Sequence, residues 1–137
     1  MTEPRSLVIE REIPHPPEKI WRALTQPHLI EEWLMTNDFK PDVGHSFNLR
    51  TNPKPDVNIV IDCKVLAVEP HKTLSYTWAA MGLVTIVTWT LTPTSKGTHL
   101  RMEQAGFGPG QGQAYAGAKY GWQKFLDNLE RILVRPD

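Results

Sequence analysis

The sequence contains a single cysteine, Cys63, and has no apolar run of the about 18 residues that a membrane-spanning helix requires. One cysteine excludes an internal disulfide and fits a reducing compartment. The first residues have no apolar stretch behind a basic start, so they do not predict a signal peptide. We therefore expect a cytoplasmic protein with no membrane span.

The chain also lacks an excess of charge of either sign. Its 15 basic and 15 acidic side chains give a net charge of zero at pH 7. Nucleic-acid binding depends on a basic surface that attracts phosphates, so this balance argues against a nucleic-acid partner. The length of 137 residues corresponds to one domain, residues 1–137, which can bury about two-thirds of its unfolded surface.

Spacings typical of metal and catalytic sites are missing as well. None of the five histidines has the i, i+4 spacing of a helical metal pair, and there is no second cysteine, so we predict no metal site and no cofactor. A lone cysteine in a strand is ordinarily a core residue, although His99 could lie across the sheet as a base for Cys63. No acid–base pair emerges, and no catalytic residue is predicted.

Four alternate glycines, at positions 106, 108, 110 and 112, resemble a phosphate loop only superficially. They lack the GK[ST] ending of a P-loop and the G-x-G-x-x-G spacing of a dinucleotide site. They predict a flexible connection between a strand and a helix. Phe107 lies at the centre of this connection and is a candidate gate for a cavity.

The longest regular pattern is a helix over residues 113–134, roughly 33 Å long at 1.5 Å per residue. At a period of 3.6 its apolar residues share one side: Ala114, Ala118, Trp122, Phe125, Leu126, Leu129, Ile132 and Leu133. The first half of this helix is rich in alanine and glycine. A helix of this length needs an apolar surface to lie on.

The remaining segments alternate in the manner of strands. The pattern predicts a strand at 6–13, short helices at 18–24 and 27–34, and strands at 46–51, 58–69, 73–79, 83–92 and 98–105. Apolar residues on both faces of segment 58–69 would be explained by a bulge or by burial on both faces near one end. The expected fold is α+β: a curved antiparallel sheet of about six to seven strands wrapped around the C-terminal helix, with two short helices after the first strand.

Several short segments occur in a characteristic order along nearly the whole chain. They are residues 13–25 (IPHPPEKIWRALT), Glu32-Trp33, Val43-Gly44, residues 65–70 (VLAVEP), 74–78 (LSYTW), 91–93 (LTP) and 97–100 (GTHL), and Gly121-Trp122 followed by Leu126 and Leu129. Together they resemble the START-like (SRPBCC), helix-grip superfamily, in the bacterial branch similar to the C-terminal domain of the activator of the Hsp90 ATPase. The resemblance implies an apolar cavity between sheet and helix, which in relatives binds lipids, sterols or polyketides.

From the small residues of the helix and this resemblance we expect a hydrophobic ligand between residues 114–121 and the sheet. An empty pocket of about 300 Å³ would cost about 7 kcal/mol, a large part of the about 5–15 kcal/mol that stabilises a domain, so the pocket should be small or occupied. The predicted lining residues are Trp33, Met35, Phe39, Phe47, Tyr76, Trp78, Trp89, Met102, Gln104, Phe107, Ala118 and Tyr120.

Among these residues, Trp33, Met35 and Phe39 form a candidate lid, and Gln104 is the best candidate for a hydrogen bond to the ligand, ahead of Arg50 and Glu103. Any single inward aromatic side chain is, however, ordinarily part of a packed core.

Two other functions remain open. An enzyme of the aromatase or cyclase type, known in the resembled superfamily, would need a titratable group facing inward. A protein-binding module like the chaperone activator would need an exposed apolar patch on the outer sheet face. That face is instead expected to be polar, because it carries Thr73, Ser75, Thr77, Thr88, Thr90 and Thr92. The chain is expected to be a monomer or a homodimer.

The assigned face of the C-terminal helix generates a stability prediction. If Trp122 is a core anchor, Trp122→Ala should lower the free energy of unfolding by about 3–5 kcal/mol, measured by urea denaturation. A loss below about 1 kcal/mol would show that the helix face is misassigned.

Overall fold

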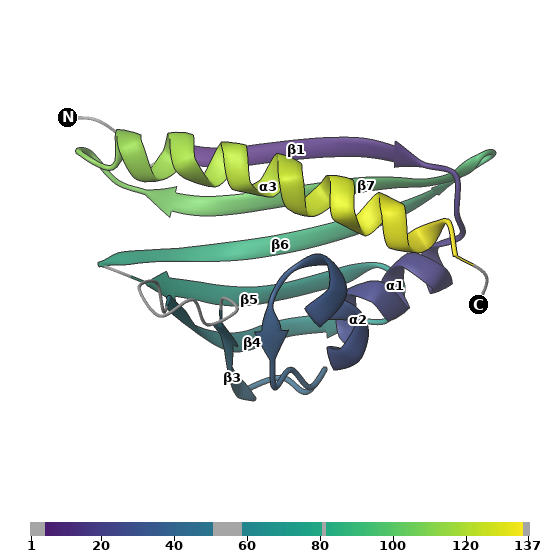
Figure 1. Cartoon of the computed structure of the whole chain (residues 1–137), viewed down its shortest axis with the longest axis horizontal. Helices are drawn as coiled ribbons and strands as arrows, with labels where there is room; N and C mark the ends of the chain where they lie inside the picture. Colours follow the sequence, from purple (N-terminus) through teal and green to yellow (C-terminus); the bar gives the residue numbers. More distant parts are fainter. Residues whose placement is uncertain (1–4, 51–58, 81, 136–137) are drawn as a thin grey trace.

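The computed structural model describes residues 5–50, 59–80 and 82–135 and has the expected α+β helix-grip architecture. One seven-stranded antiparallel sheet carries a long C-terminal helix across one face, and two short helices follow the first strand (Figure 1). In chain order the elements are β1 (Arg5–Ile13), α1 (Pro17–Thr25), α2 (Pro27–Trp33), β2 (Thr36–Asn37), β3 (Ser46–Arg50), β4 (Val60–Glu69), β5 (Thr73–Ala80), β6 (Leu83–Thr94), β7 (Gly97–Phe107) and α3 (Gly112–Leu133).

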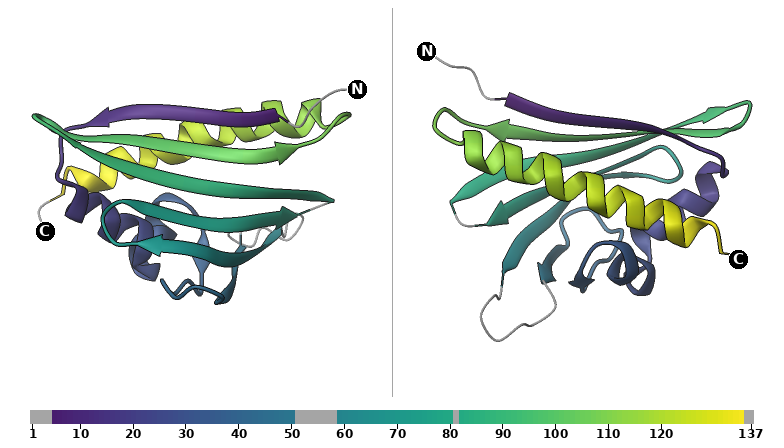
Figure 2. Two further views of the ribbon diagram at one scale, coloured as in Figure 1. Left: turned by 180° about the vertical axis from the view of Figure 1, so that it is seen from behind. Right: turned by 45° about the horizontal axis from the view of Figure 1, so that its top comes forward.

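The strands follow the order β1-β7-β6-β5-β4-β3-β2 across the sheet. Strands β2 to β7 therefore form a continuous meander, and β1 pairs with β7 at the far edge. The sheet curves around α3, and α1 and α2 lie on the same side of the sheet as α3 (Figure 2). The opposite face carries no helix when it is seen from behind (Figure 2, left). The core is consequently a single layer between the concave face and three helices.

Alternation along the strands produces the apolar inner face, as the sequence predicted. On β6 the buried residues are Thr85, Val87, Trp89 and Leu91, at a spacing of two. Successive side chains of a strand point to opposite faces, so this spacing directs all four toward the helices. Inner residues of β7 pair with them in register, for example Met102 opposite Trp89.

Of the two explanations for the mixed pattern of segment 58–69, the structure shows the bulge. The register between β4 and β5 shifts between Val65 and Ala67. Before the shift Ile61, Cys63 and Val65 are buried, whereas after it Ala67 is exposed and Val68 is partly buried. The extra residue thus explains why apolar residues occur on both sides of this segment in the sequence.

The buried face of α3 agrees with the prediction in its second half and differs in its first. Trp122, Leu126, Leu129 and Leu133 are buried. The expected burial of Ala114 is wrong, because its neighbour Tyr115 turns toward the sheet and packs edge-on against Phe107 of β7, with ring centroids 5.3 Å apart. No helix in the described part of the chain is long and apolar enough to cross a membrane.

A second correction concerns the outer face of the sheet. The threonine and serine positions on β5 and β6 are present as expected, and Ser75 and Thr88 hydrogen-bond across the strands at 3.2 Å. The face is nevertheless not uniformly polar. It also exposes five aliphatic side chains: Val8, Val60, Leu66, Val84 and Ile86.

Arg11 ties the edge strand β1 to the middle of α3. Its guanidinium lies 2.8 Å from Oδ1 of Asp127 and 2.6 Å from Oε2 of Glu130, and it also donates to the side-chain oxygen of Gln123 at 2.8 Å. The Arg11 side chain is 19% exposed, so solvent screens this network less than an isolated surface pair. The contact fixes residues 123–130 of α3 on the sheet and does not reach the first half of the helix.

On the outer face, His99 of β7 lies between two carboxylates of β1. Its Nδ1 atom contacts Glu12, and its Nε2 atom lies 3.1 Å from Oε1 of Glu10. The hydrogen bonds that the carboxylates of Glu12 and Glu10 accept from the ring raise the pKa of His99 above its ordinary value of about 6.5. Arg101 approaches Glu10 to 3.9 Å and adds a second cation to this cluster.

The raised pKa of His99 predicts a pH dependence of stability with a definite sign. The protonated ring stabilises the fold fully below the pKa of the unfolded chain, and this contribution disappears as the pH rises through the higher folded pKa. The melting temperature of His99→Gln should therefore fall below that of the native sequence at acidic pH, and the two should converge once the pH exceeds the raised pKa of the folded chain. Melting curves that differ equally at all pH values would contradict this assignment. His28→Gln, at an exposed position on α2, is the control.

Candidate functional site

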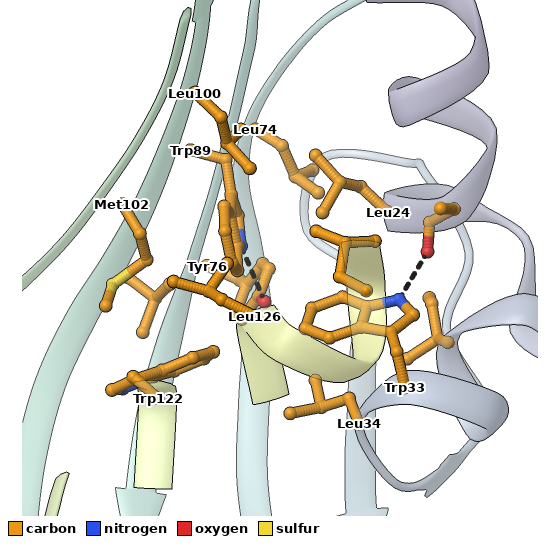
Figure 3. Close-up of a cluster of buried hydrophobic side chains, with 14 of the residues drawn as sticks. Leu24, Trp33, Leu34, Leu74, Tyr76, Trp89, Leu100, Met102, Trp122 and Leu126 are labelled. Carbon is orange, nitrogen blue, oxygen red and sulfur yellow. Dashed lines mark hydrogen bonds between the residues drawn. The ribbon is translucent and has the colours of Figure 1, made fainter. Parts of the chain in front are cut away.

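Four tryptophans, two from the sheet and two from the helices, meet at the centre of the core. The ring of Trp89 on β6 lies 5.7 Å from that of Trp33 on α2 and 5.6 Å from that of Trp122 on α3, edge-on in both cases. Trp78 on β5 extends the cluster, with its ring centroid 5.0 Å from Trp122. Figure 3 shows Trp33 and Trp122 entering this space from the two helices. Such edge-on pairs stabilise a core beyond the area they bury.

Trp33 belongs to this core rather than to a detached lid. Its indole N–H donates to the backbone oxygen of Ala23 on α1 at 2.7 Å, and the side chain is buried (Figure 3). This bond also joins α2 to α1. It adds to the stability of two short helices that have no side-chain cap of their own.

A second aromatic group continues the core toward β3. Phe39, Phe47 and Tyr76 pack on one another, and the rings of Phe39 and Phe47 lie 5.0 Å apart. The Tyr76 hydroxyl accepts a hydrogen bond of 3.0 Å from the indole N–H of Trp89, which connects the two groups (Figure 3). The aromatic interior is therefore continuous from α3 to β3.

Gln104 is the central polar residue of the interior. Its Oε1 atom accepts a hydrogen bond of 2.8 Å from the indole N–H of Trp122, and its Nε2 atom donates to Oγ1 of Thr85 at 2.9 Å. The Thr85 hydroxyl in turn donates to the backbone oxygen of Trp78 at 2.9 Å. All buried side-chain N and O atoms among the described residues have a hydrogen-bond partner. Gln104 thus joins α3 to the sheet, and its amide is already engaged.

Two buried side chains of the interior are titratable. Burial raises the pKa of the Cys63 thiol to about 12, and the carboxylates of Asp62 and Asp38 act in the same direction. Burial also raises the pKa of Tyr76, against the smaller opposing effect of the Trp89 hydrogen bond. Both groups are therefore protonated at neutral pH. In residues 5–50, 59–80 and 82–135, no group of three or more His, Cys, Asp or Glu side chains is arranged to hold a metal ion.

At one end of the core several apolar side chains are only partly covered. They come from five elements or their flanks and all pack against the buried cluster: Met35, Ile59, Ala80, Leu83, Ala118 and Phe125. We call these six residues the rim. The strand register brings the four sheet-side members, Met35, Ile59, Ala80 and Leu83, to the same end of the sheet, because Arg50 pairs with both Thr36 and Val60 and Ala80 pairs with Leu83. Phe125 lies 5.8 Å from Trp122, so the rim is continuous with the aromatic core.

Most of the predicted lining residues face this one interior. Nine are buried on the inner side of the fold: Trp33, Phe39, Phe47, Tyr76, Trp78, Trp89, Met102, Gln104 and Phe107. Met35 and Ala118 lie in the rim. Tyr120 does not join them, since its side chain is 65% exposed and carries the Lys124 ammonium 4.6 Å above its ring. Arg50 is exposed, and Glu103 lies on the outer face, 3.8 Å from Arg101.

The sequence predicted Trp122 as a core packing residue and predicted no role for Thr85. In the structure both side chains form hydrogen bonds with Gln104. Thr85 follows the period-two pattern of β6 and was detectable by that signal. The hollows that described residues line also lie away from the expected position. One hollow lies between α1, α2 and the end of α3, a second adjoins it, and a third lies beside the β6–β7 turn, and residues 114–121 line none of the three.

The architecture agrees with the family to which the sequence is similar. The sequence model described as "Activator of Hsp90 ATPase homolog 1-like protein" matches residues 14–134. The chain belongs to this family. The match covers every element from α1 to α3, and the structure has the START-like fold. No curated protein matches the chain.

The chain is similar to several solved structures, three of which are described here. Protein MLL2253 from Mesorhizobium loti is 62% identical, with a TM-score of 0.89 over 97% of this chain and 99% of that one. DynU16, a protein in the dynemicin biosynthetic locus, is 27% identical, with a TM-score of 0.80 over 93% of this chain and 46% of that one. This chain therefore spans about half the length of DynU16. CalU16 from Micromonospora echinospora is 25% identical, with a TM-score of 0.80 over 95% and 76% of the two chains.

The network around Gln104 generates a prediction about stability. Gln104→Leu leaves the buried indole N–H of Trp122 without an acceptor, so the free energy of unfolding should fall by about 1–3 kcal/mol in urea denaturation. Trp122→Phe removes the donor of the same hydrogen bond. The double variant should therefore lose less than the sum of the two single losses.

The adjacent Glu103→Gln on the outer face is the matched control and should change stability by less than about 0.5 kcal/mol. Strict additivity of Gln104→Leu and Trp122→Phe would show that the two side chains do not depend on each other.

Proposed function

We propose that this chain binds a small hydrophobic molecule, lipid-, sterol- or polyketide-like, between the sheet and the first half of α3. The observation that carries the proposal is the rim. It is the one place we identify where apolar side chains from the helical layer and from β4 to β6 remain partly exposed while in contact with the buried aromatic cluster. A ligand that covers the rim would remove this apolar surface from water, at about 25 cal/mol per Å².

The attachment of α3 favours the same location. Residues 123–130 are held by Arg11, and Trp122, Leu126 and Leu129 are buried beneath them. The first half of the helix contacts the sheet through Tyr115, which packs on Phe107, and Ala116 and Gly117 are exposed. Ala118 is partly buried against the core, so a ligand beside it would contact small helix residues rather than large ones.

The chemistry of the interior supports an apolar ligand. Gln104 and Thr85 already satisfy one another, together with Trp122 and the backbone. A ligand with a strongly polar buried end would have to replace these bonds, whereas an apolar ligand leaves them intact. Among similar proteins, DynU16 comes from the dynemicin biosynthetic locus, so one relative of this fold is associated with the synthesis of a small organic molecule.

No carboxylate or histidine among the described residues faces the interior. The cyclase alternative therefore has no candidate acid or base there. Glu103 lies on the outer face, and the buried titratable groups, Cys63 and Tyr76, have raised pKa values that keep them protonated. General acid–base catalysis works best with a group that titrates near the working pH. The interior is therefore better suited to binding than to proton transfer.

The test uses the uncharged fluorescent dye Nile red as a probe of the rim. Ala118→Phe fills the space beside Trp122 and should weaken dye binding at least about tenfold, which corresponds to about 1.4 kcal/mol. Ala116→Phe adds the same ring two residues away at an exposed position, and binding should be unchanged. Equal affinities for the two variants, or no dye binding by the native chain, would overturn the proposal. Thermal melting establishes that both variants are folded.

A further inference from the structure

The turn between β5 and β6 differs in chemistry from the other two turns of the meander from β4 to β7. The turn between β4 and β5 carries Glu69 and Lys72, and the turn between β6 and β7 carries Ser95 and Lys96. The turn between β5 and β6 lies within residues 79–84, Ala-Ala-Met-Gly-Leu-Val, which contain no charged or hydrogen-bonding side chain. Turns and loops at a protein surface ordinarily carry polar residues. An apolar turn therefore calls for an explanation.

The described side chains of this segment project from one end of the sheet. We call Ala79, Ala80, Leu83 and Val84 the tip. Val84 is 69% exposed, and a Cβ atom added to Gly82 would meet no other described residue within 4 Å apart from its chain neighbours. The start of β6 lies at the same end of the molecule as the start of α3 (Figure 1). The tip is thus open to the surroundings beside the first half of α3.

The tip is apolar on both faces of the sheet. Ala79 pairs with Val84 on the outer face, where Ile86, two residues further along β6, is 43% exposed. Ala80 pairs with Leu83 on the inner face, and both belong to the rim. A protein surface covers one face of a hairpin, whereas a fluid apolar medium surrounds both. The two-sided pattern therefore favours a lipid layer over a protein partner.

Size and charge narrow the choice of partner further. Four small or medium side chains are far less than the about 800 Å² that each partner buries in a standard protein interface, which argues against a second copy of this chain. The charges beside the tip are balanced, because Asp62 lies opposite Ala79 and Arg50 lies opposite Val60. Attraction to anionic lipids depends on an excess of basic side chains. A lipid without net charge fits this balance.

We propose that the tip inserts into the surface of a zwitterionic lipid bilayer. Exposed apolar patches on soluble domains mark interaction sites, and affinity for a lipid interface rises with the apolar area that is buried there. Because Ala80 and Leu83 also belong to the rim, insertion brings the rim to the boundary of the acyl chains. Docking stands on the tip alone. The consequence that a hydrophobic molecule enters the rim from the bilayer rests on the proposed function.

Co-sedimentation with phosphatidylcholine vesicles tests the proposal. The native chain should bind the vesicles, and Val84→Asp on the outer face and Leu83→Asp on the inner face should each lower the partition coefficient at least about tenfold, because a carboxylate is costly to transfer into lipid. Binding of the native chain should be the same at low and high salt, since no attraction between charges is involved. Loss of binding at high salt would contradict the apolar mode of docking.

A valine elsewhere on the surface provides the matched control. Val43 precedes β3 and is 67% exposed, so Val43→Asp makes the same change at the same exposure away from the tip and should leave vesicle binding unchanged. Thermal melting establishes that the three variants are folded. An equal loss for Val43→Asp, or a loss for only one of Val84→Asp and Leu83→Asp, would overturn the inference, because the binding would then be unspecific or one-sided.

Two further outcomes separate this inference from its alternatives. Failure of the native chain to bind vesicles while it binds Nile red in solution would overturn the docking and leave the proposed function standing. Vesicle binding without Nile red binding would have the reverse meaning. Val84 does not belong to the rim, so Val84→Asp should leave Nile red binding in solution unchanged. Self-association of the chain that Val84→Asp abolishes would assign the tip to a second copy and overturn the inference.

Discussion

The attachment of the Trp122 indole to the sheet is the interaction on which the remainder of this structure depends. Its ring packs against Trp78 and Trp89 of the sheet, and its N–H donates to Gln104 in the middle of β7. In an apolar interior a satisfied polar group fixes a geometry that apolar packing alone leaves adjustable. The single bond to Gln104, supported by Thr85, therefore sets the position of α3 along the sheet. The bond of Trp33 to Ala23 fixes the two short helices in the same manner.

This anchor divides α3 into two halves with different surroundings. From Trp122 onward the helix presents large apolar side chains to the core, and Arg11 binds its polar flank from the edge strand. Before Trp122 the helix presents Ala118 and exposes Ala114 and Ala116. One half acts as structural scaffold, since it joins the sheet to α1 and α2. The other half presents mostly small side chains, apart from Tyr115, which packs on Phe107.

The architecture was predictable from the sequence because it depends on local periodicity. Alternation identified the inner residues of β6 and β7, and apolar residues on both faces identified the bulge near Val65. The partners of Gln104 were not predictable, since Trp122 and Thr85 lie 18 and 19 residues away on other elements. Ala114 was misplaced because the period of a helix fixes spacing only to within about one residue at its frayed beginning. The hollow between α1, α2 and the end of α3 could not be foreseen either. Lys19 and Arg135, which both line it, are more than 100 residues apart in the sequence.

The completeness of the polar network also constrains what the interior can accept. An unsatisfied Gln104 would have offered a ligand both a donor and an acceptor inside the core. In the folded chain Trp122 and Thr85 occupy both, so recognition there depends on shape and apolar contact.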